Sequence, residues 1–206
     1  MIRLALPKGR NLEPALGALR AAGLGLAGFE GRRLRQTLEA DGVELLLFKD
    51  WDLPLYVEHG IADCGFVGSD VLDEVDGDLL RPLRLTAGRC RLSFIGRPGA
   101  LPAPGSQVRL ATKYPLTARR EVARRPWGAE ILRLSGSIEL APLLDLAEIA
   151  LDIVQTGRTL AENHLEELEV IAEVAPCLVI NRASFQQHRA TLNELIDRLE
   201  AAGVAE

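Results

Sequence analysis

The sequence has 206 residues, of which 48% are hydrophobic and 26% are charged, and its net charge at pH 7 is -5. A chain of this length and composition can bury a full apolar core, which excludes a disordered protein and predicts one large domain or two small lobes. The acidic balance is not typical of nucleic-acid binding, and no segment approaches the roughly 20 apolar residues of a membrane span. We therefore expect a cytoplasmic protein with neither a nucleic acid nor a membrane as its partner.

Strands and helices are expected to alternate along the chain, because buried apolar runs are separated by segments with apolar residues at helical spacing. In the first half, the expected elements are a strand at 2–6, a helix from Leu12 that ends at Gly23, a strand at 43–48, a short helix that Asp52 caps and that ends at Gly60, and strands at 62–67, 79–85 and 90–95. The first strand, turn and helix form a βα unit.

The second half begins with a loop at 96–105, whose three glycines and three prolines mark either a lobe boundary or an exposed flap. The expected elements after it are a strand at 107–112, a helix at 117–125, a strand at 130–134, a helix at 138–144, a long β stretch at 168–180 broken at Pro176, and a final helix that Ser184 caps and that buries Leu192, Leu195, Ile196 and Leu199. This pattern predicts an α/β protein.

The cysteines Cys64, Cys90 and Cys177 are odd in number and widely spaced. Such spacing argues against a disulfide framework or a zinc site. We expect reduced, buried thiols.

One segment, residues 152–160, reads Asp-Ile-Val-Gln-Thr-Gly-Arg-Thr-Leu and lies between the strand at 130–134 and the β stretch. An apolar strand ends there in a Thr-Gly turn that opens a helix, and such a turn can hold phosphate with backbone N–H groups, hydroxyls and an arginine fork. Asp152 can accept hydrogen bonds from sugar hydroxyls, so the segment predicts a phosphoribosyl ligand. An ordinary strand-to-helix turn with a threonine cap is the alternative.

Lysine is rare in this chain: of 24 basic residues, only Lys8, Lys49 and Lys113 are lysines. Each lies at or near the end of an expected strand. Open α/β sheets bind ligands at the carboxyl ends of their strands, so these ammonium groups are candidates for ligand contacts. A chance distribution of three residues is the alternative.

Five segments together resemble the ATP phosphoribosyltransferase family. They are Leu6-Pro7-Lys8-Gly9-Arg10, the stretch from Asp52 to Asp70, Ala111-Thr112-Lys113-Tyr114-Pro115, Gly136-Ser137-Ile138-Glu139-Leu140-Ala141-Pro142, and the Asp152–Leu160 segment. The last one is similar to the family's phosphoribosyl-pyrophosphate loop. The motifs follow the family's order over residues 6–160.

The resemblance implies a fold like the type II periplasmic binding proteins, with two lobes that each contain a mixed sheet flanked by helices. We expect a discontinuous lobe I of residues 1–88 plus 177–206, and a lobe II of residues 89–176 that carries the phosphate loop. The implied reaction is the first step of histidine biosynthesis. In it, N1 of ATP attacks C1 of phosphoribosyl pyrophosphate, and pyrophosphate leaves.

The resemblance also implies roles for the residues on the phosphoribosyl side. Lys8 and Arg10 serve the departing pyrophosphate, Asp152 binds the ribose hydroxyls, and Mg²⁺ is bridged mainly by substrate phosphates, its protein ligands being unknown. The 5′-phosphate is held by Thr156, Gly157, Arg158 and Thr159. Glu139 either acts on the sugar or the metal, or caps and solvates its own helix.

On the ATP side, the resemblance implies Gly68, Ser69 and Asp70 at the nucleotide cleft, although Asp70 is equally suited to cap the helix after it. Lys113 and Tyr114 fit a contact from the second lobe.

Other basic residues have open assignments. Arg32, Arg33 and Arg35 form a segment that either reaches triphosphate oxygens, with Arg33 nearest the family's arginine, or is a solvated face. Lys49 stands where many members carry arginine, so it binds as a point charge or not at all. The run Arg119, Arg120, Arg124 and Arg125 is expected on a solvent-facing helix or in a subunit contact.

The chain ends shortly after Gly203, before the regulatory domain of longer family members, so the resemblance is to the short-form catalytic subunit. Short members work with a regulatory subunit related to histidyl-tRNA synthetase, which implies a homo-oligomer within a hetero-oligomer. A non-catalytic, two-lobed effector module that closes on a small anion or nucleotide is the alternative function.

Overall fold

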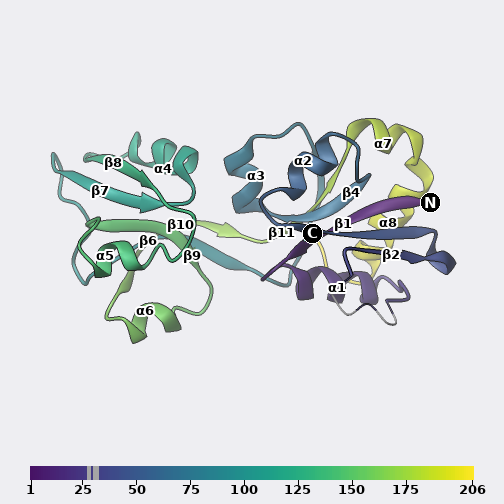
Figure 1. Cartoon of the computed structure of the whole chain (residues 1–206), viewed down its shortest axis with the longest axis horizontal. Helices are drawn as coiled ribbons and strands as arrows, with labels where there is room; N and C mark the ends of the chain where they lie inside the picture. Colours follow the sequence, from purple (N-terminus) through teal and green to yellow (C-terminus); the bar gives the residue numbers. More distant parts are fainter. Residues whose placement is uncertain (27–28, 30–32) are drawn as a thin grey trace. The chain divides into compact units, whose positions relative to one another are not determined.

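The computed structural model describes residues 1–26, 29 and 33–206. These residues divide into two compact units, one made of Met1–Arg89 with Ala175–Glu206 (unit 1) and the other of Cys90–Val174 (unit 2). In the part of the chain that is described, no helix has the length and apolar character needed to cross a membrane. The expected α/β class, with a mixed sheet and helices in each part, is confirmed (Figure 1).

The sheet of unit 1 has the strand order β2-β3-β1-β4-β11-β5. Its strands are β1 (Ile2–Lys8), β2 (Arg35–Leu38), β3 (Val43–Lys49), β4 (Cys64–Gly68), β5 (Leu80–Arg84) and β11 (Pro176–Ile180). β1 pairs in parallel with both β3 and β4, whereas β2, β5 and β11 pair antiparallel with their neighbours. The carboxyl ends of β1, β3 and β4 therefore lie at the same edge of this sheet.

β1 continues two residues beyond the expected strand, through Pro7 and Lys8. Pro7 lacks an N–H and would interrupt a central strand. It is tolerated because the pairing of β1 with β4 covers only Leu4 and Ala5, while the pairing with β3 continues as far as Lys8 opposite Lys49. The turn therefore begins at Gly9 rather than at Pro7.

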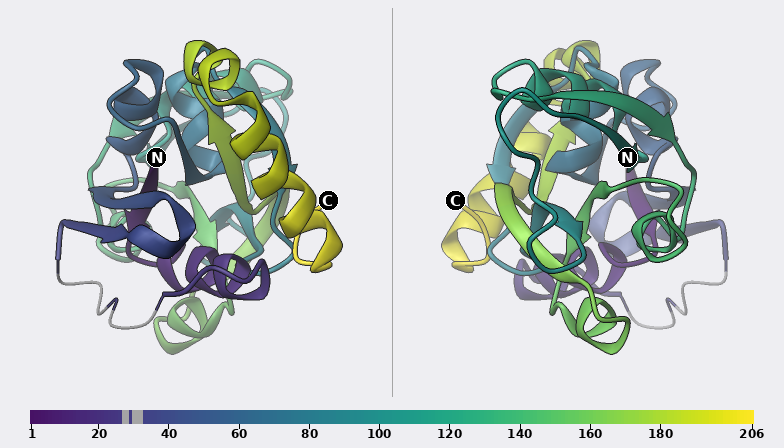
Figure 2. Two further views of the ribbon diagram at one scale, coloured as in Figure 1. Left: turned by 90° about the vertical axis from the view of Figure 1, so that its right-hand side faces the viewer. Right: turned by 90° about the vertical axis from the view of Figure 1, so that its left-hand side faces the viewer.

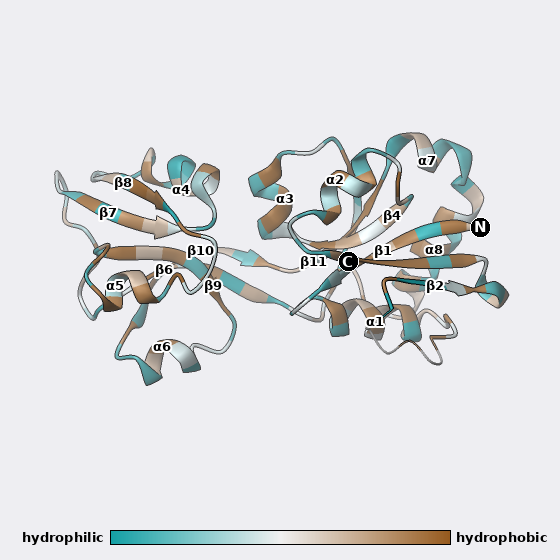
Figure 3. Cartoon of the chain, viewed as in Figure 1, coloured by the Kyte–Doolittle hydropathy of each residue, from teal (hydrophilic) through white to brown (hydrophobic). Residues whose placement is uncertain are grey.

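Helices cover both faces of the unit 1 sheet. They are α1 (Leu12–Ala21), the 3-10 helix η1 (Glu39–Asp41), α2 (Leu53–Glu58), α3 (Ser69–Val75), α7 (Arg182–Gln187) and α8 (Arg189–Ala201). The apolar residues of α1 and α8 join one buried cluster with β1 and β3, and those of α2 and α3 join another on the opposite face. Figure 3 shows the central strands mainly in brown, whereas the helices carry both brown and teal residues.

The C-terminal segment corrects one expectation. Ser184 does not cap a single final helix: residues 182–201 form α7 and α8, and α7 is capped by Asn181, whose side chain accepts a hydrogen bond of 2.9 Å from the Ser184 N–H. The apolar face predicted for the last helix is confirmed for α8, which buries Leu192, Leu195 and Leu199 and is the long yellow helix in Figure 2.

Three other expectations differ from the structure. The strand β2 was not predicted, because its sequence Arg-Gln-Thr-Leu is polar and it is an edge strand paired with β3. Asp52 occupies the N-cap position of α2, but its side chain makes no capping hydrogen bond. The β stretch at 168–180 is interrupted at Ala175 rather than Pro176, and its two parts belong to different sheets.

The sheet of unit 2 has the strand order β10-β6-β9-β7-β8. Its strands are β6 (Cys90–Gly96), β7 (Gln107–Thr112), β8 (Gly128–Arg133), β9 (Ile149–Val154) and β10 (Glu166–Val174). β7 is parallel to β8 and β9, so the carboxyl ends of these three strands share an edge. The glycine- and proline-rich loop lies between β6 and β7, inside unit 2, so it is not the boundary between the units.

The helices of unit 2 are α4 (Pro115–Val122), α5 (Leu140–Leu143) and α6 (Arg158–Glu162). α4 packs through Ala118 on one face of the sheet, in a cluster with Phe94 and Trp127, whereas Ala141 of α5 and Leu160 of α6 pack on the other face. Cys64, Cys90 and Cys177 are free and buried, as expected.

A buried carboxylate joins three elements of unit 1. Asp63, which is 1% exposed, accepts hydrogen bonds from the backbone N–H of Arg3 (2.7 Å), from its guanidinium (3.1 Å) and from the Ser184 hydroxyl (2.7 Å). Burial raises the pKa of Asp63, but the hydrogen bonds from Arg3 and Ser184 outweigh burial, and the net pKa lies below the ordinary value. The ionised side chain thus holds β1, β4 and α7 together.

Replacing Asp63 by asparagine should lower the free energy of unfolding at pH 7 by about 2 kcal/mol, because the half-exposed Arg3 guanidinium loses a charged hydrogen-bond partner. The native pKa is below the unfolded value of about 3.9, so the stabilisation is fully present above that value and is lost as the pH falls through the native pKa. Urea unfolding across a pH series should show the difference between wild type and Asp63→Asn constant above about pH 5 and shrinking below about pH 4. The exposed Asp197→Asn is the matched control, and equal stabilities of all three proteins would contradict the assignment.

Candidate active site

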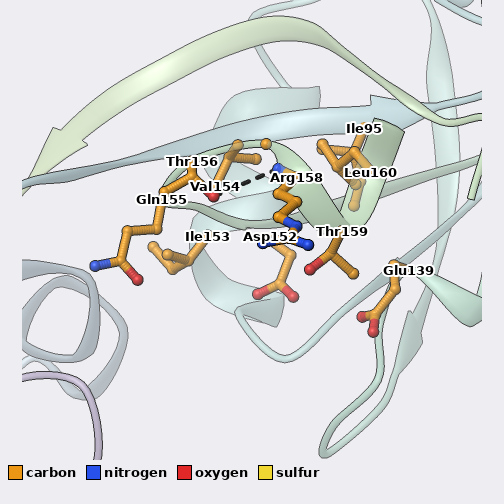
Figure 4. A pocket seen from close by; sticks show the side chains of 11 residues that line it. Ile95, Glu139, Asp152, Ile153, Val154, Gln155, Thr156, Arg158, Thr159 and Leu160 are labelled. Carbon is orange, nitrogen blue, oxygen red and sulfur yellow. Dashed lines mark hydrogen bonds between the residues drawn. The ribbon is translucent and has the colours of Figure 1, made fainter. Parts of the chain in front are cut away.

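A cavity in unit 2 lies over the turn between β9 and α6. Its volume is about 250 Å³, and it is lined by Ile95, Glu139 and residues 152–160. Figure 4 shows the carboxylates of Asp152 and Glu139 and the hydroxyl of Thr159 directed toward the same open region beside the loop. The segment predicted to bind a phosphoribosyl group therefore forms one wall of a real cavity.

Gly157 gives the loop its shape. It sits at the N-cap of α6 with φ +74°, a left-handed conformation that is strained for any residue with a side chain. A Cβ atom built there would meet only the Val154 side chain, at 4.0 Å, so the space above Gly157 is open. The turn thus presents bare backbone to the cavity, as an anion-binding turn requires.

The polar side chains of the loop are exposed and engaged only in weak local contacts. The Thr156 hydroxyl accepts a long hydrogen bond of 3.4 Å from the backbone N–H of Arg158. The Arg158 guanidinium donates a hydrogen bond of 2.8 Å to the carboxylate of Glu162, on the next turn of α6. An ion pair this exposed contributes little to stability, so Arg158 can exchange Glu162 for a stronger anion at small cost. Thr159 is also exposed.

Asp152 is mostly buried at the floor of the cavity, and its principal cationic neighbour is Lys113. The Lys113 ammonium lies 3.4 Å from one carboxylate oxygen of Asp152, which is an ion pair rather than a well-formed hydrogen bond. Burial raises the pKa of Asp152, and the charge of Glu139 adds to this, while Lys113 opposes both; the net shift is upward. The sequence placed Lys113 with ATP, whereas in this unit it lies beside the predicted ribose-binding carboxylate.

Glu139 occupies the N-cap position of α5 but makes no capping hydrogen bond, and its side chain lines the cavity. Tyr114 is 1% exposed in the apolar cluster on the α4 face, with the Lys113 ammonium 5.1 Å from the centre of its ring. Tyr114 therefore packs in the core beside Lys113. A contact of Tyr114 with ATP is implied by the family resemblance alone.

The predicted residues of unit 1 gather at the carboxyl edge of its sheet. Lys8 and Lys49 end the adjacent parallel strands β1 and β3, lie directly opposite each other in the strand register, and are both exposed. Arg10 follows in the turn after β1, and its guanidinium donates a hydrogen bond of 2.9 Å to Asp70. Three cations from two separate parts of the sequence thus share one sheet edge.

The Gly68-Ser69-Asp70 segment links β4 to α3 at this same edge. Gly68 is the N-cap of α3, and the Ser69 hydroxyl accepts a hydrogen bond of 3.3 Å from the Ala175 N–H. Asp70 lies in the first turn of α3, is 4% exposed, and pairs with Arg10 rather than capping the helix through its side chain. Any contact of Asp70 with a nucleotide would thus compete with its bond to Arg10.

Two residues at this edge were missed by the sequence reasoning. Asn11, 1% exposed, donates from its side-chain amide to Asp50 at 3.0 Å, and Asp50 directly follows β3. The available signals were an asparagine just before a helix and a carboxylate just after a strand. Both are too common to single out a site.

The remaining arginines take no part in either group. Arg33 is exposed, Arg32 lies outside the described residues, and Arg35 pairs with Glu44 on the adjacent strand. Arg119 and Arg120 are exposed on α4, while Arg124 pairs with Glu121 and Arg125 with Glu169. A solvent-facing set with local ion pairs agrees with the expectation for this run.

Comparisons with known proteins identify the family. A sequence model of the family described as "HisG: ATP phosphoribosyltransferase" matches residues 49–201. The chain is 44% identical to the ATP phosphoribosyltransferase of Thermus thermophilus over 198 residues, covering 96% of this chain and 95% of that protein. It is 44% identical to the enzyme of the same name from Geobacillus kaustophilus over 206 residues, covering 98% of each.

Solved structures show the same relationship. The ATP phosphoribosyl transferase (HisG:HisZ) complex from Thermotoga maritima matches with a TM-score of 0.83 and 33% identity, over 98% of each chain. The periplasmic aliphatic sulphonate binding protein SsuA from Escherichia coli matches with a TM-score of 0.63 over 98% of this chain and 72% of that chain, but with only 10% identity, so it shows likeness of fold alone. The expected periplasmic-binding-protein-like fold is confirmed, and this chain belongs to the ATP phosphoribosyltransferase family.

Proposed function

We propose that this chain is the catalytic subunit of a short-form ATP phosphoribosyltransferase. It transfers the phosphoribosyl group from phosphoribosyl pyrophosphate to N1 of ATP, giving 1-(5-phosphoribosyl)-ATP and pyrophosphate, the first step of histidine biosynthesis. The observation that carries the proposal is the cavity in which a half-buried carboxylate, Asp152, stands beside an exposed Thr-Gly-Arg-Thr turn. A module that only binds an anion has no need of a sugar-binding acid at that position.

The chemistry of this reaction asks for positioning and charge more than for proton transfer. Adenine N1 is a neutral nucleophile with no proton to lose before attack, so a general base is not required. As the bond from C1 to pyrophosphate breaks, negative charge grows on the leaving group and the ribose acquires oxocarbenium character. Anionic groups near the ribose and cationic groups near the pyrophosphate therefore favour the transition state.

The described side chains supply both kinds of group. The 5′-phosphate is held by the backbone of Gly157 and by Thr156, Arg158 and Thr159, while Asp152, paired with Lys113, orients the ribose hydroxyls. Lys8 and Arg10 bind the departing pyrophosphate. Arg33, Lys49, Gly68, Ser69, Asp70 and Tyr114 are proposed on the ATP side.

Mg²⁺ is the proposed cofactor. Among the described residues, no group of three or more histidine, cysteine, aspartate or glutamate side chains could hold a metal ion alone. The cavity does offer carboxylate oxygens from Glu139 and Asp152, which suit an ion whose other ligands are phosphate oxygens. Such an ion would neutralise charge on the pyrophosphate.

The proposed assembly is a homo-oligomer, at least a dimer, joined in the cytoplasm by a separate regulatory subunit. Support comes from the solved relative of Thermotoga maritima, which is a HisG:HisZ complex, and from the matched length of the relatives. The regulatory partner implied by the sequence is a relative of histidyl-tRNA synthetase. We also propose that units 1 and 2 correspond to the two expected lobes.

The function is tested by mixing the purified chain with ATP, phosphoribosyl pyrophosphate and Mg²⁺ and following the ultraviolet absorbance of the N1-substituted adenine. Formation of the adduct, together with stoichiometric pyrophosphate, is the expected result. Binding of either substrate without any adduct, even when the regulatory subunit is added, would favour the non-catalytic module.

Asp152→Asn and Arg158→Ala should each lower kcat/KM for phosphoribosyl pyrophosphate by roughly one to two decades, because each removes a charged hydrogen bond of about 1.5 to 3 kcal/mol. Steady-state kinetics on folded variants measures the effect. Glu162→Ala, which breaks the same exposed ion pair but keeps the guanidinium, and the exposed Asp145→Asn are matched controls that should behave as wild type. Wild-type kinetics in both test variants would remove these residues from the site.

Gly157→Val should reduce phosphoribosyl pyrophosphate binding more than Arg158→Ala does. The branched side chain strains the left-handed turn and fills the space that the phosphate needs, whereas the arginine variant loses one contact. Gly105→Val is the control, because Gly105 has a similar φ of +79° and open space around it but lies in a distant loop of unit 2. Calorimetric binding that is equal in Gly157→Val and Gly105→Val would show that strain alone explains the loss.

Histidine should inhibit the isolated chain weakly or not at all, and should inhibit strongly once the regulatory subunit is bound. Feedback requires a second ligand site coupled to the first, and we assign that site to the partner. Initial rates with increasing histidine, with and without the partner, measure the difference. Strong inhibition of the isolated chain at micromolar histidine would refute the short-form assignment.

A further inference from the structure

A cluster of four polar side chains lies at the carboxyl edge of the unit 1 sheet, beside the exposed Lys8 and Lys49. It consists of Arg10 and Asn11 from the turn after β1, Asp50 from the end of β3, and Asp70 from the first turn of α3. Arg10 donates to Asp70 at 2.9 Å, and Asn11 donates to Oδ2 of Asp50 at 3.0 Å. Among the described residues, the other oxygen of Asp50, Oδ1, is buried and has no hydrogen-bond partner.

The cluster depends on a glycine. A Cβ atom on Gly68 would lie 2.2 Å from Oδ1 of Asp70, 3.0 Å from the Asn11 amide and 3.3 Å from the Arg10 guanidinium. Since Asp70 and Asn11 are 4% and 1% exposed, they have little room to move aside. The close approach of the four side chains is therefore a built feature of this edge.

The charges in the cluster do not balance. The Arg10 guanidinium pairs with Asp70 and also acts on Asp50 through its charge, so one guanidinium serves two carboxylates, and the two lysines are exposed at the strand ends. Burial and the neighbouring Asp70 raise the pKa of Asp50 to about 6, although Arg10, the Asn11 amide and the backbone of Gly68 oppose the rise. A carboxylate that titrates so close to neutrality responds to any further negative charge placed near it.

We propose that Asp50 is a positioning residue for Arg10, and that it takes up a proton when a pyrophosphate group binds Arg10 and Lys8. This inference rests on the proposed function for the identity of the anion. The proton comes from solvent and attaches to the unpartnered Oδ1, while Oδ2 keeps the hydrogen bond from Asn11. When Asp50 is neutral, Asp70 is the one carboxylate of the cluster that still attracts Arg10. The positive charge of Arg10 then interacts more strongly with the bound anion.

The groups that face Asp50 determine the direction of the response. Arg10 and Asn11 approach from the β1–α1 turn, Gly68 and Asp70 from the β4–α3 turn, and Lys49 and Asp52 are near it in sequence. Pyrophosphate adds negative charge on the Arg10 side, which raises the pKa of Asp50 further, so binding takes up a proton and tightens as the pH falls toward 6.

The test is calorimetric titration of sodium pyrophosphate into the full chain at pH 7, in buffers with different ionisation enthalpies. The slope of observed enthalpy against buffer enthalpy gives the number of protons taken up. Wild type should take up roughly half a proton more than Asp50→Asn, and its affinity should weaken by about threefold more per unit rise in pH. Asp76→Asn, an exposed aspartate at the end of α3, is the matched control and should retain the wild-type slope.

Equal proton uptake in wild type and Asp50→Asn would overturn the proposal, as would the absence of pyrophosphate binding to a wild-type chain that forms adduct. If Asp50 had a purely structural role, the Asp50→Asn substitution would change the affinity for pyrophosphate equally at every pH. The slope of observed enthalpy against buffer enthalpy would then stay the same as in wild type. If Asp50→Asn does not fold, carbon NMR of the Asp50 carboxyl in wild type decides the question: its pKa must rise when pyrophosphate is added. The adduct assay on wild type tests the proposed function separately, because pyrophosphate binding requires no turnover.

Discussion

The parallel pairing of β1 with β3 and β4 is the constraint on which the site in unit 1 depends. Parallel strands end at the same edge of a sheet, so Lys8, Lys49 and the Gly68–Asp70 segment lie at one edge. Arg10 and Asp70 form an ion pair there although they are 60 positions apart in the sequence. The same rule operates in unit 2, where β7 and β9 are parallel and bring Lys113 next to Asp152. Each unit thus places a cation beside a carboxylate at one sheet edge, although the two residues are far apart in the sequence.

The carboxylates of this protein fall into two classes according to how well their oxygens are satisfied. Asp63 is buried but receives hydrogen bonds from Arg3 and Ser184, its pKa is lowered, and it acts as a structural tie. Asp50 and Asp152 are also withdrawn from solvent, but each has an oxygen with no hydrogen-bond partner among the described residues, and the pKa of each is raised. A buried carboxylate oxygen without a hydrogen-bond partner is costly in a folded protein. Such oxygens are concentrated at sites where a bound ligand supplies the missing hydrogen bond.

The candidate phosphate loop combines a packed backbone with exposed polar side chains. Below it, Val154 and Leu160 anchor the turn in the apolar face that α5 and α6 share. Above it, the side chains of Thr156, Arg158 and Thr159 are exposed, and Arg158 holds Glu162 only through a solvent-screened ion pair. The backbone is therefore positioned by packing, while its polar side chains are exposed and make only weak local contacts.

Local signals in the sequence predicted the class of fold, most strands and the turn at Gly157 before α6, because apolar runs and a glycine at a helix start are read from neighbouring residues. It did not predict β2, whose polar residues carry no strand pattern, and it assigned the cap to Ser184, whereas Asn181 caps α7. The pairing of Lys113 with Asp152, of Arg10 with Asp70, and of Asn11 with Asp50 was decided only by the tertiary structure. Each of these contacts joins the ends of different strands, and the register that brings strand ends together depends on the packing of whole sheets rather than on any local segment.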